Sequence, residues 1–169
     1  AVVWDSTTMQ ELKQLLGHNA AVNTAAFSPD GQWLATAGDD NQVLLWSVSE
    51  INDSTASPKP IALIGHTAKV IHLTFNADST RLASSSWDRR VGLWDVPNRQ
   101  SIRFFKGHQG PVNSAEFHPT QPQLYSAGGD GHIRLWNLET GEYLRSIVKN
   151  GFGINVMAVS PELNVLAYG

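Results

Sequence analysis

Short apolar runs, separated by turn-forming residues, recur along most of the chain. Three stretches carry the full pattern: VNTAAFSPDGQWLATAGDDNQVLLWS, VIHLTFNADSTRLASSSWDRRVGLWD and VNSAEFHPTQPQLYSAGGDGHIRLWN. In each stretch, Gly, Pro, Asp and Asn separate three runs of apolar or β-branched residues, which is typical of strand, turn, strand, turn, strand. A fourth run precedes each of three Gly-His pairs, in LKQLLGH, IALIGH and IRFFKGH. The pattern predicts an all-β protein built from four-stranded units.

The same residue types recur at fixed distances after each Gly-His pair. Eighteen, 22 and 28 positions after the His come a hydroxyl residue, an Asp and a Trp. The three sets are His18, Thr36, Asp40 and Trp46; His66, Ser84, Asp88 and Trp94; and His108, Ser126, Asp130 and Trp136. Four residue types at identical offsets in three copies indicate a tandem repeat with a period of 42 residues.

One repeat is longer than the others, because six additional residues fall within SVSEINDSTASPKP, at 47–60. This polar, Pro-containing stretch joins a third strand to a fourth strand. We expect it to form a flexible surface loop, and the alternative is a docking element.

Strand counting gives four units. Complete units are predicted at about 20–64, 69–105 and 112–147, while 1–16 supply the third and fourth strands of another unit. Residues 152–169 supply a first strand (Ile154 to Val159) and a second strand (Val165 to Tyr168). In this last unit Lys149-Asn150 replaces Gly-His and Tyr168 replaces the hydroxyl residue, so the signature is lost.

A four-stranded unit of 42 residues, with Gly-His near its start and Trp-Ser, Trp-Asp or Trp-Asn near its end, resembles the WD40-repeat β-propeller family. The resemblance covers essentially the whole chain. It implies three complete blades and two complementary half-blades, which form part of a seven- or eight-bladed ring. Further blades in a longer chain are the first expectation. The alternatives are two copies that complete an eight-bladed ring, and a four-bladed ring closed by pairing of the two ends.

The resemblance also implies a role for the recurring residues. In the family, the His, hydroxyl, Asp and Trp of each blade form a buried chain of hydrogen bonds. The His ring can bond the Asp through one nitrogen and the hydroxyl through the other, and the hydroxyl can accept the indole N–H. Each polar group satisfies another, so these residues are assigned a structural role.

Composition narrows the chemistry. Apolar residues make up 41% and charged residues 16% of the chain, as expected for a globular protein. A net charge of −3 does not favour nucleic-acid binding, and without cysteine there is no disulfide and no Cys-ligated zinc. A hydrolytic triad is disfavoured because the His, Ser and Asp recur in every unit, and the His residues lack metal-ligand spacing. We therefore predict no catalytic residue, no metal and no cofactor.

Other features bear on location. No run of 18 apolar residues occurs, so we expect no membrane partner. AVVWD does not resemble a signal peptide and reads as the middle of a strand, so the natural N-terminus is expected to lie elsewhere. We expect a cytoplasmic protein.

The resemblance implies that partner contacts lie on the face that carries the Gly-His loops and the turns between second and third strands, at the rim of the central channel. In the second complete unit this places Lys69, Ile71 and Trp87 together. Other rim candidates are Asn23, Asp39, Asn113 and Asn155. An exposed Trp at a turn is unusual and suits a partner anchor, and the alternative is a lid on the neighbouring blade. Arg89 and Arg90, which follow, are expected to be solvated, and the alternative is that one of them binds an acidic group on a partner.

These observations favour a non-catalytic scaffold that presents its loops to a protein or peptide partner. A recognition or sensor module of a larger signalling or assembly protein is the alternative. An enzyme with a site at the channel centre is a third possibility, for which Asp39 is the main rim carboxylate.

Overall fold

The computed structural model describes residues 1–149, 151–163 and 165–169, and almost all of its regular structure is antiparallel sheet. Three four-stranded sheets have the orders β3-β4-β5-β6, β7-β8-β9-β10 and β11-β12-β13-β14, and two-stranded sheets lie at either end. The strands are β1 Val2–Trp4, β2 Glu11–Gln14, β3 Val22–Phe27, β4 Trp33–Gly38, β5 Val43–Ser47, β6 Ile61–Leu63, β7 Val70–Phe75, β8 Arg81–Ser86, β9 Arg90–Asp95, β10 Gln100–Lys106, β11 Val112–Phe117, β12 Gln123–Gly128, β13 His132–Asn137, β14 Tyr143–Lys149, β15 Met157–Val159 and β16 Leu166–Tyr168. We call the three large sheets the first, second and third blades.

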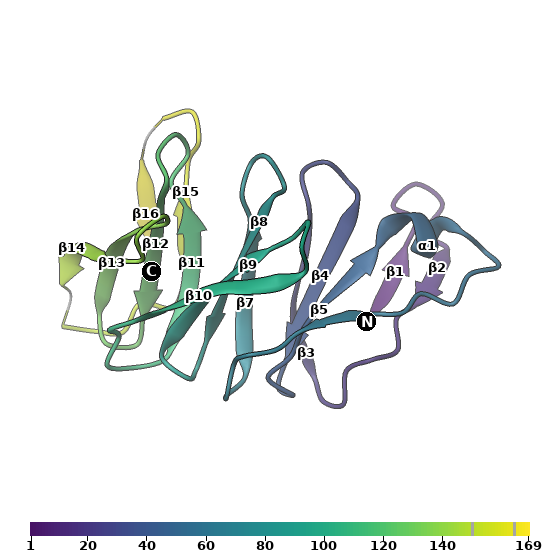
Figure 1. The fold of residues 1–169 in the computed structure, drawn as a ribbon, viewed down its shortest axis with the longest axis horizontal. Helices are drawn as coiled ribbons and strands as arrows, with labels where there is room; N and C mark the ends of the chain where they lie inside the picture. The colour runs from purple at the N-terminus through teal and green to yellow at the C-terminus, as the bar shows by residue number, and fades with distance from the viewer. Residues whose placement is uncertain (150, 164) are drawn as a thin grey trace.

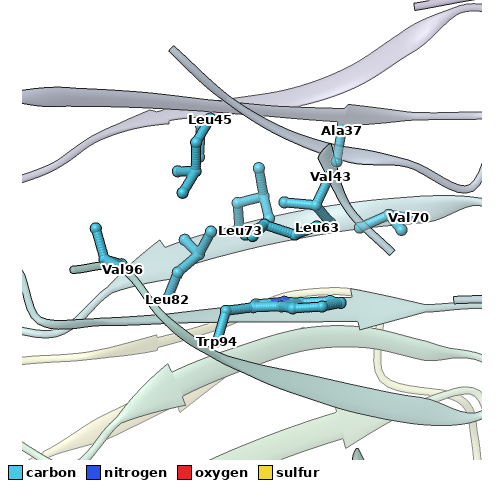
Figure 2. Close-up of a cluster of buried hydrophobic side chains, with 10 residues drawn as sticks. Ala37, Val43, Leu45, Leu63, Val70, Leu73, Leu82, Trp94 and Val96 are labelled. Carbon is cyan, nitrogen blue, oxygen red and sulfur yellow. The ribbon is translucent and has the colours of Figure 1, made fainter. Parts of the chain in front are cut away.

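The blades stand face to face in a row, from the N-terminal pair β1–β2 to the C-terminal pair β15–β16 (Figure 1). Apolar side chains fill the space between neighbouring sheets, because each strand turns alternate residues toward opposite faces. Figure 2 shows the cluster between the first and second blades, where Leu45 and Ala37 face Leu82 and Trp94. A second cluster lies between the second and third blades. The core is therefore a series of inter-blade layers rather than a single centre.

The two end sheets do not pair with each other. In the described residues β1 pairs only with β2 and β16 pairs only with β15, and the two pairs lie at opposite ends of the row (Figure 1). The structure is therefore an open row and differs from the four-bladed ring considered from the sequence. The size of the complete ring, and its completion by further blades or by a second copy, stay predictions that the mass in solution would test.

The C-terminal half-blade departs from the expected strand bounds. Its strands are shorter than the predicted 154–159 and 165–168, because the backbone N–H groups of Asn155 and Val156 both donate to the carbonyl of Gly169 and interrupt the ladder. The proposed replacement of Gly-His by Lys149-Asn150 involves Asn150, which lies outside the described residues.

The lengthened stretch 47–60 is only partly the surface loop that the sequence suggested. It begins with a short helix, α1 (Val48–Asn52), whose Ile51 is buried in a cluster with Leu15 and Trp46, while 53–60 form neither helix nor strand. The Nζ of Lys13 donates to the carbonyls of Asp53 and Ala56, at 2.9 and 3.0 Å. The insertion thus packs the N-terminal half-blade against the first blade, because Ile51 lies in the same apolar cluster as Leu15 and Trp46.

Candidate interaction face

The second blade shows how the recurring polar residues are arranged. His66 Nδ1 lies 2.7 Å from an oxygen of Asp88, and His66 Nε2 lies 2.7 Å from the hydroxyl of Ser84. The indole N–H of Trp94 donates to the same hydroxyl at 2.8 Å. A carboxylate can only accept, so Nδ1 carries the proton and Nε2 accepts from the hydroxyl. Every donor in this series of hydrogen bonds then has one acceptor.

The first and third blades repeat this arrangement, which we call the tetrad. The His–Asp distances are 2.9 Å for His18–Asp40 and His108–Asp130, and the His–hydroxyl distances are 2.8 Å to Thr36 and 2.7 Å to Ser126. The indoles of Trp46 and Trp136 donate to these hydroxyls at 2.9 and 2.8 Å. The structure thus brings together all twelve residues that the spacing grouped into three sets.

Each tetrad also fixes loops on one face of the blade. The Asp accepts the backbone N–H of the residue after the His, as from Thr67 to Asp88 at 3.1 Å. This bond ties the loop before the first strand to the turn between the second and third strands. We call the face that carries these loops and turns the loop face. Its backbone is held in place by buried side chains, which suits a surface that must keep its shape.

The three tetrad carboxylates remain ionised. Burial alone would raise the pKa of Asp88, but hydrogen bonds from His66 and Arg90 outweigh it and hold the pKa below its ordinary value. The pKa of Asp130 is lowered against burial by the backbone N–H of Gln109 and by Arg134, and the pKa of Asp40 is lowered in a similar way. Burial also lowers the pKa of His108, which keeps its ring neutral.

Two arginines take part in tetrads, which the sequence reasoning missed. Arg90, expected to be solvated, donates to Asp88 at 2.7 Å and to the carbonyl of Gly65 at 2.9 Å, and its guanidinium lies over the Phe104 ring. Arg134 donates to Asp130 at 2.6 Å. Both lie on the third strand of their blade, beyond the turn that carries the tetrad Asp, and that position is the signal that could have identified them. Arg89 is exposed, as expected.

The glycine of each Gly-His pair is required by close packing. A Cβ on Gly65 would collide with the ring of Phe104, and a Cβ on Gly107 would lie 3.1 Å from Trp136. Both glycines also have positive φ. The loop can therefore pass over the aromatic core and deliver its His to the tetrad.

Equivalent positions at the turn tips are held by the same backbone bond. The N–H groups of Asp39, Trp87 and Gly129 donate to the carbonyls of Ala21, Lys69 and Pro111, at 2.8, 3.0 and 2.8 Å. The backbone is therefore alike in the three blades, and only the side chains differ. The second blade alone presents an aromatic side chain at this position.

Trp87 has a close side-chain neighbour from its own blade, Lys69. The Nζ of Lys69 lies 3.6 Å from the centroid of the Trp87 ring, in cation–π geometry. Trp87 nevertheless keeps 48% of its surface exposed, and Lys69 and Ile71 are partly exposed. The structure therefore places an accessible aromatic and a cation together at the loop face.

The asparagine candidates serve the boundaries between blades. The side-chain amide of Asn23 donates to the carbonyl of Val70 in the next blade at 3.1 Å, and that of Asn113 donates to the carbonyl of Ile154 at 2.8 Å. Asn23 also donates to Asp39 at 2.7 Å. Asn155 is exposed. Two of the rim residues are thus engaged in holding blades together, whereas Trp87 and Lys69 are paired with each other at the surface.

The described part of the chain contains no group of three or more His, Cys, Asp or Glu side chains placed to hold a metal ion. Its single short helix is far from the length and hydropathy that a membrane crossing would require.

Comparison with known proteins agrees with this architecture. The family described as WD domain, G-beta repeat matches residues 9–47, 58–95 and 99–137, more than half of the chain. The chain belongs to this WD40-repeat family.

Similar proteins are much longer than this chain. It is 26% identical over 171 residues to Periodic tryptophan protein 2 homolog of Dictyostelium discoideum, a match covering 99% of the chain and 13% of that protein. It is 27% identical over 173 residues to Apoptotic protease-activating factor 1 of Rattus norvegicus, covering 96% and 10%. A shorter match, 47% identical over 51 residues, is to CCR4-associated factor 4 homolog of Candida glabrata and covers 30% and 9%. Together with the repeats, these relatives support a protein-interaction scaffold.

Proposed function

We propose that this chain is a non-catalytic scaffold whose loop face binds a protein or peptide partner through Trp87, with Lys69 and Ile71 beside it. The observation that carries the proposal is the exposed Trp87, set on a backbone that the Asp88 tetrad fixes. The other conspicuous polar residues of the blades are engaged in tetrads or in inter-blade bonds.

Two physical properties of Trp87 favour binding, namely its exposed apolar surface and its rigid setting. An exposed indole on a free surface is unfavourable, and its burial by a partner removes a large apolar area from water. Trp is among the residues that most often dominate the energy of an interface. Its rigid ring and the fixed turn reduce the conformational entropy lost on binding. Lys69, 3.6 Å from the ring centroid, adds a positive charge that would favour an acidic or carbonyl-rich contact.

The test compares Trp87→Ala with Phe27→Ala, which removes an exposed aromatic from the opposite face. Each chain is immobilised, partners are captured from cell extract, and the affinity of a purified partner is then measured. We expect Trp87→Ala to weaken binding by about 2 kcal/mol or more, roughly thirtyfold, with an unchanged melting temperature. Phe27→Ala should bind as the unaltered chain does. Unchanged binding by Trp87→Ala, or a large fall in its melting temperature, would favour the lid interpretation.

A recognition or sensor module within a larger signalling or assembly protein is the second candidate. It is supported by the relatives, of whose length this chain spans only 13% and 10%. The test introduces Trp87→Ala into the longest natural form of the protein and measures the activity of any attached domain with and without the partner. An effect on the response to the partner, with unchanged basal activity, is expected.

A channel-centred enzyme is the third candidate, and Asp39 is its discriminating residue. Asp39 accepts from Asn23 at 2.7 Å, which is a structural use of the carboxylate. Turnover that Asp39→Asn abolishes would overturn the scaffold proposal.

A further inference from the structure

A groove of about 870 Å³ runs between the second and third blades, on the face opposite the loop face. It is bordered by the turns that join first to second strands, at 76–80 and 118–122, and by Arg103 and Glu139 at its outer part. Phe75, Phe117, Leu93 and Ile102 give it apolar walls. Its volume is in the range of sites that hold small ligands or peptide side chains.

Glu116 of β11 lines this groove and has few partners. One oxygen accepts the hydroxyl of Thr74 at 3.2 Å, and the other lies 3.5 Å from Nε2 of His72. The Glu116 side chain is only 24% exposed. Among the described residues no lysine or arginine forms an ion pair with it.

The two arginines of the groove, Arg81 and Arg103, each have one acceptor, although the Nε of Arg103 is buried without one among the described residues. Arg81 pairs with Asp95 at 3.0 Å, and Arg103 donates to the carbonyl of Glu139 at 2.7 Å. Asp78 accepts from both the backbone and the hydroxyl of Thr80. Glu116 is therefore the partly buried carboxylate of the groove that keeps unused acceptor capacity, since a carboxylate offers about four acceptor sites and one hydroxyl bonds it.

We propose that this groove binds an arginine or lysine side chain of a peptide segment, with Glu116 accepting its N–H groups and the apolar walls covering its aliphatic stem. A basic side chain combines an apolar stem with a charged end, which matches walls of Phe and Leu around a carboxylate. The charge-assisted bond would also supply the cation that the partly buried carboxylate lacks. This site is separate from the Trp87 surface and does not depend on it.

The surroundings of Glu116 make the proposed binding pH-dependent. Burial raises the pKa of Glu116 to about 7, against a lowering by the Thr74 hydroxyl. The titratable groups around it are His72 on β7, whose pKa is lowered by burial, Tyr125 opposite on β12, and His118 at the end of β11. A cation prefers the ionised carboxylate, so its binding strengthens as the pH rises through 7.

The test is an NMR titration of the isotopically labelled chain with three probes, Ac-Leu-Arg-NH2, Ac-Leu-Gln-NH2 and Ac-Leu-Glu-NH2. We expect the Arg probe alone to shift the amides of Thr74, Glu116 and Phe117. Its affinity should rise about tenfold from about pH 6 to about pH 8, because the ionised fraction of a group with a pKa near 7 rises from about one tenth to nine tenths.

Two variants decide the origin of the binding. Glu116→Gln should reduce the Arg probe to the affinity of the Gln probe at both pH values, whereas Glu139→Gln, at the outer part of the groove, should bind it normally. Retained binding by Glu116→Gln would overturn the proposal. Equal or stronger binding of the Glu probe would also overturn it and would assign the groove to acidic peptides held by Arg81 and Arg103.

Discussion

Asp88 and Glu116 are carboxylates of adjacent blades whose pKa values move in opposite directions. The Asp88 side chain is 2% exposed and accepts from His66, Arg90 and the backbone of Thr67, so its pKa is held below the ordinary range. Glu116 has one hydroxyl donor, and burial raises its pKa to about 7. The difference shows that hydrogen-bond donors around a buried carboxylate decide whether it is charged in the fold.

The number of donors also distinguishes a carboxylate that is used within the fold from one that can bind a group from outside the chain. Asp88 is surrounded by donors that belong to its own blade and to the loop before it, so its charge is used within the fold. Glu116 lies at a boundary between blades and has a single hydroxyl donor. A donor from outside the chain could therefore improve the surroundings of Glu116 and not those of Asp88.

The largest effect is expected from Asp88→Ala. Removing this carboxylate leaves the His66 N–H without an acceptor and removes one of the two acceptors of the Arg90 guanidinium, and we expect the free energy of unfolding to fall by about 2–3 kcal/mol. Asp39→Asn, one residue before the corresponding Asp40, keeps an acceptor for Asn23, so it is the matched control and should change stability little. Urea unfolding near pH 7 measures both, and equal stability of Asp88→Ala and the unaltered chain would contradict the tetrad assignment.

At low pH the difference in stability between Asp88→Ala and the unaltered chain should become small. Because the folded pKa of Asp88 is below the unfolded value of 3.8, its contribution is complete above that pH and is lost as the pH falls toward the folded pKa. The stability gap between Asp88→Ala and the unaltered chain should therefore narrow below about pH 4. A gap that stays constant with pH would show that lost packing, and not charge, causes the effect.

The sequence predicts contacts within one blade better than contacts between blades. Spacing within one repeat identified the tetrad residues, because all four belong to a single blade and its preceding loop. Contacts between blades were harder to predict, although Thr74 and Glu116 are 42 residues apart, which is one repeat period. Aligned positions in consecutive blades are neighbours, so that spacing was a usable signal. The packing of α1 against Leu15 had no such signal, since it depends on an insertion found in one repeat only.

A smaller effect of opposite sign is expected from Glu116→Gln. The folded pKa of about 7 exceeds the unfolded value of 4.5, so the folded state binds more protons and stability falls as the pH rises between these values. A difference of one unit between the folded and unfolded pKa corresponds to about 1.4 kcal/mol of stability. Because the Glu116 side chain is partly exposed, we reduce the total for this group and expect a loss of about 1–2 kcal/mol above pH 7. Glu116→Gln should be more stable than the unaltered chain by that amount near pH 8 and similar near pH 4.5.

The measurement is thermal unfolding across this pH range, with Glu139→Gln as the exposed control. The control should follow the unaltered chain at every pH. A Glu116→Gln variant that is less stable near pH 8 would mean that the ionised carboxylate has partners which the structure does not show.

The smallest effect is expected from Arg90→Gln, which asks how many donors a tetrad Asp requires. His66 and the Thr67 backbone would still bond Asp88, and the Arg90 side chain is partly exposed, so we expect a loss of about 1 kcal/mol or less. The control must leave the core intact, which excludes a change such as Leu44→Ala in the first blade, because that change empties a buried site. Arg89→Gln, the exposed neighbour, is suitable and should be neutral. If Arg90→Gln were as damaging as Asp88→Ala, the arginine rather than the histidine would be the main partner of Asp88. The tetrad of the first blade, in which the carboxylate of Asp40 forms its one ion pair with His18 among the described residues, would then have to be weaker than the other two.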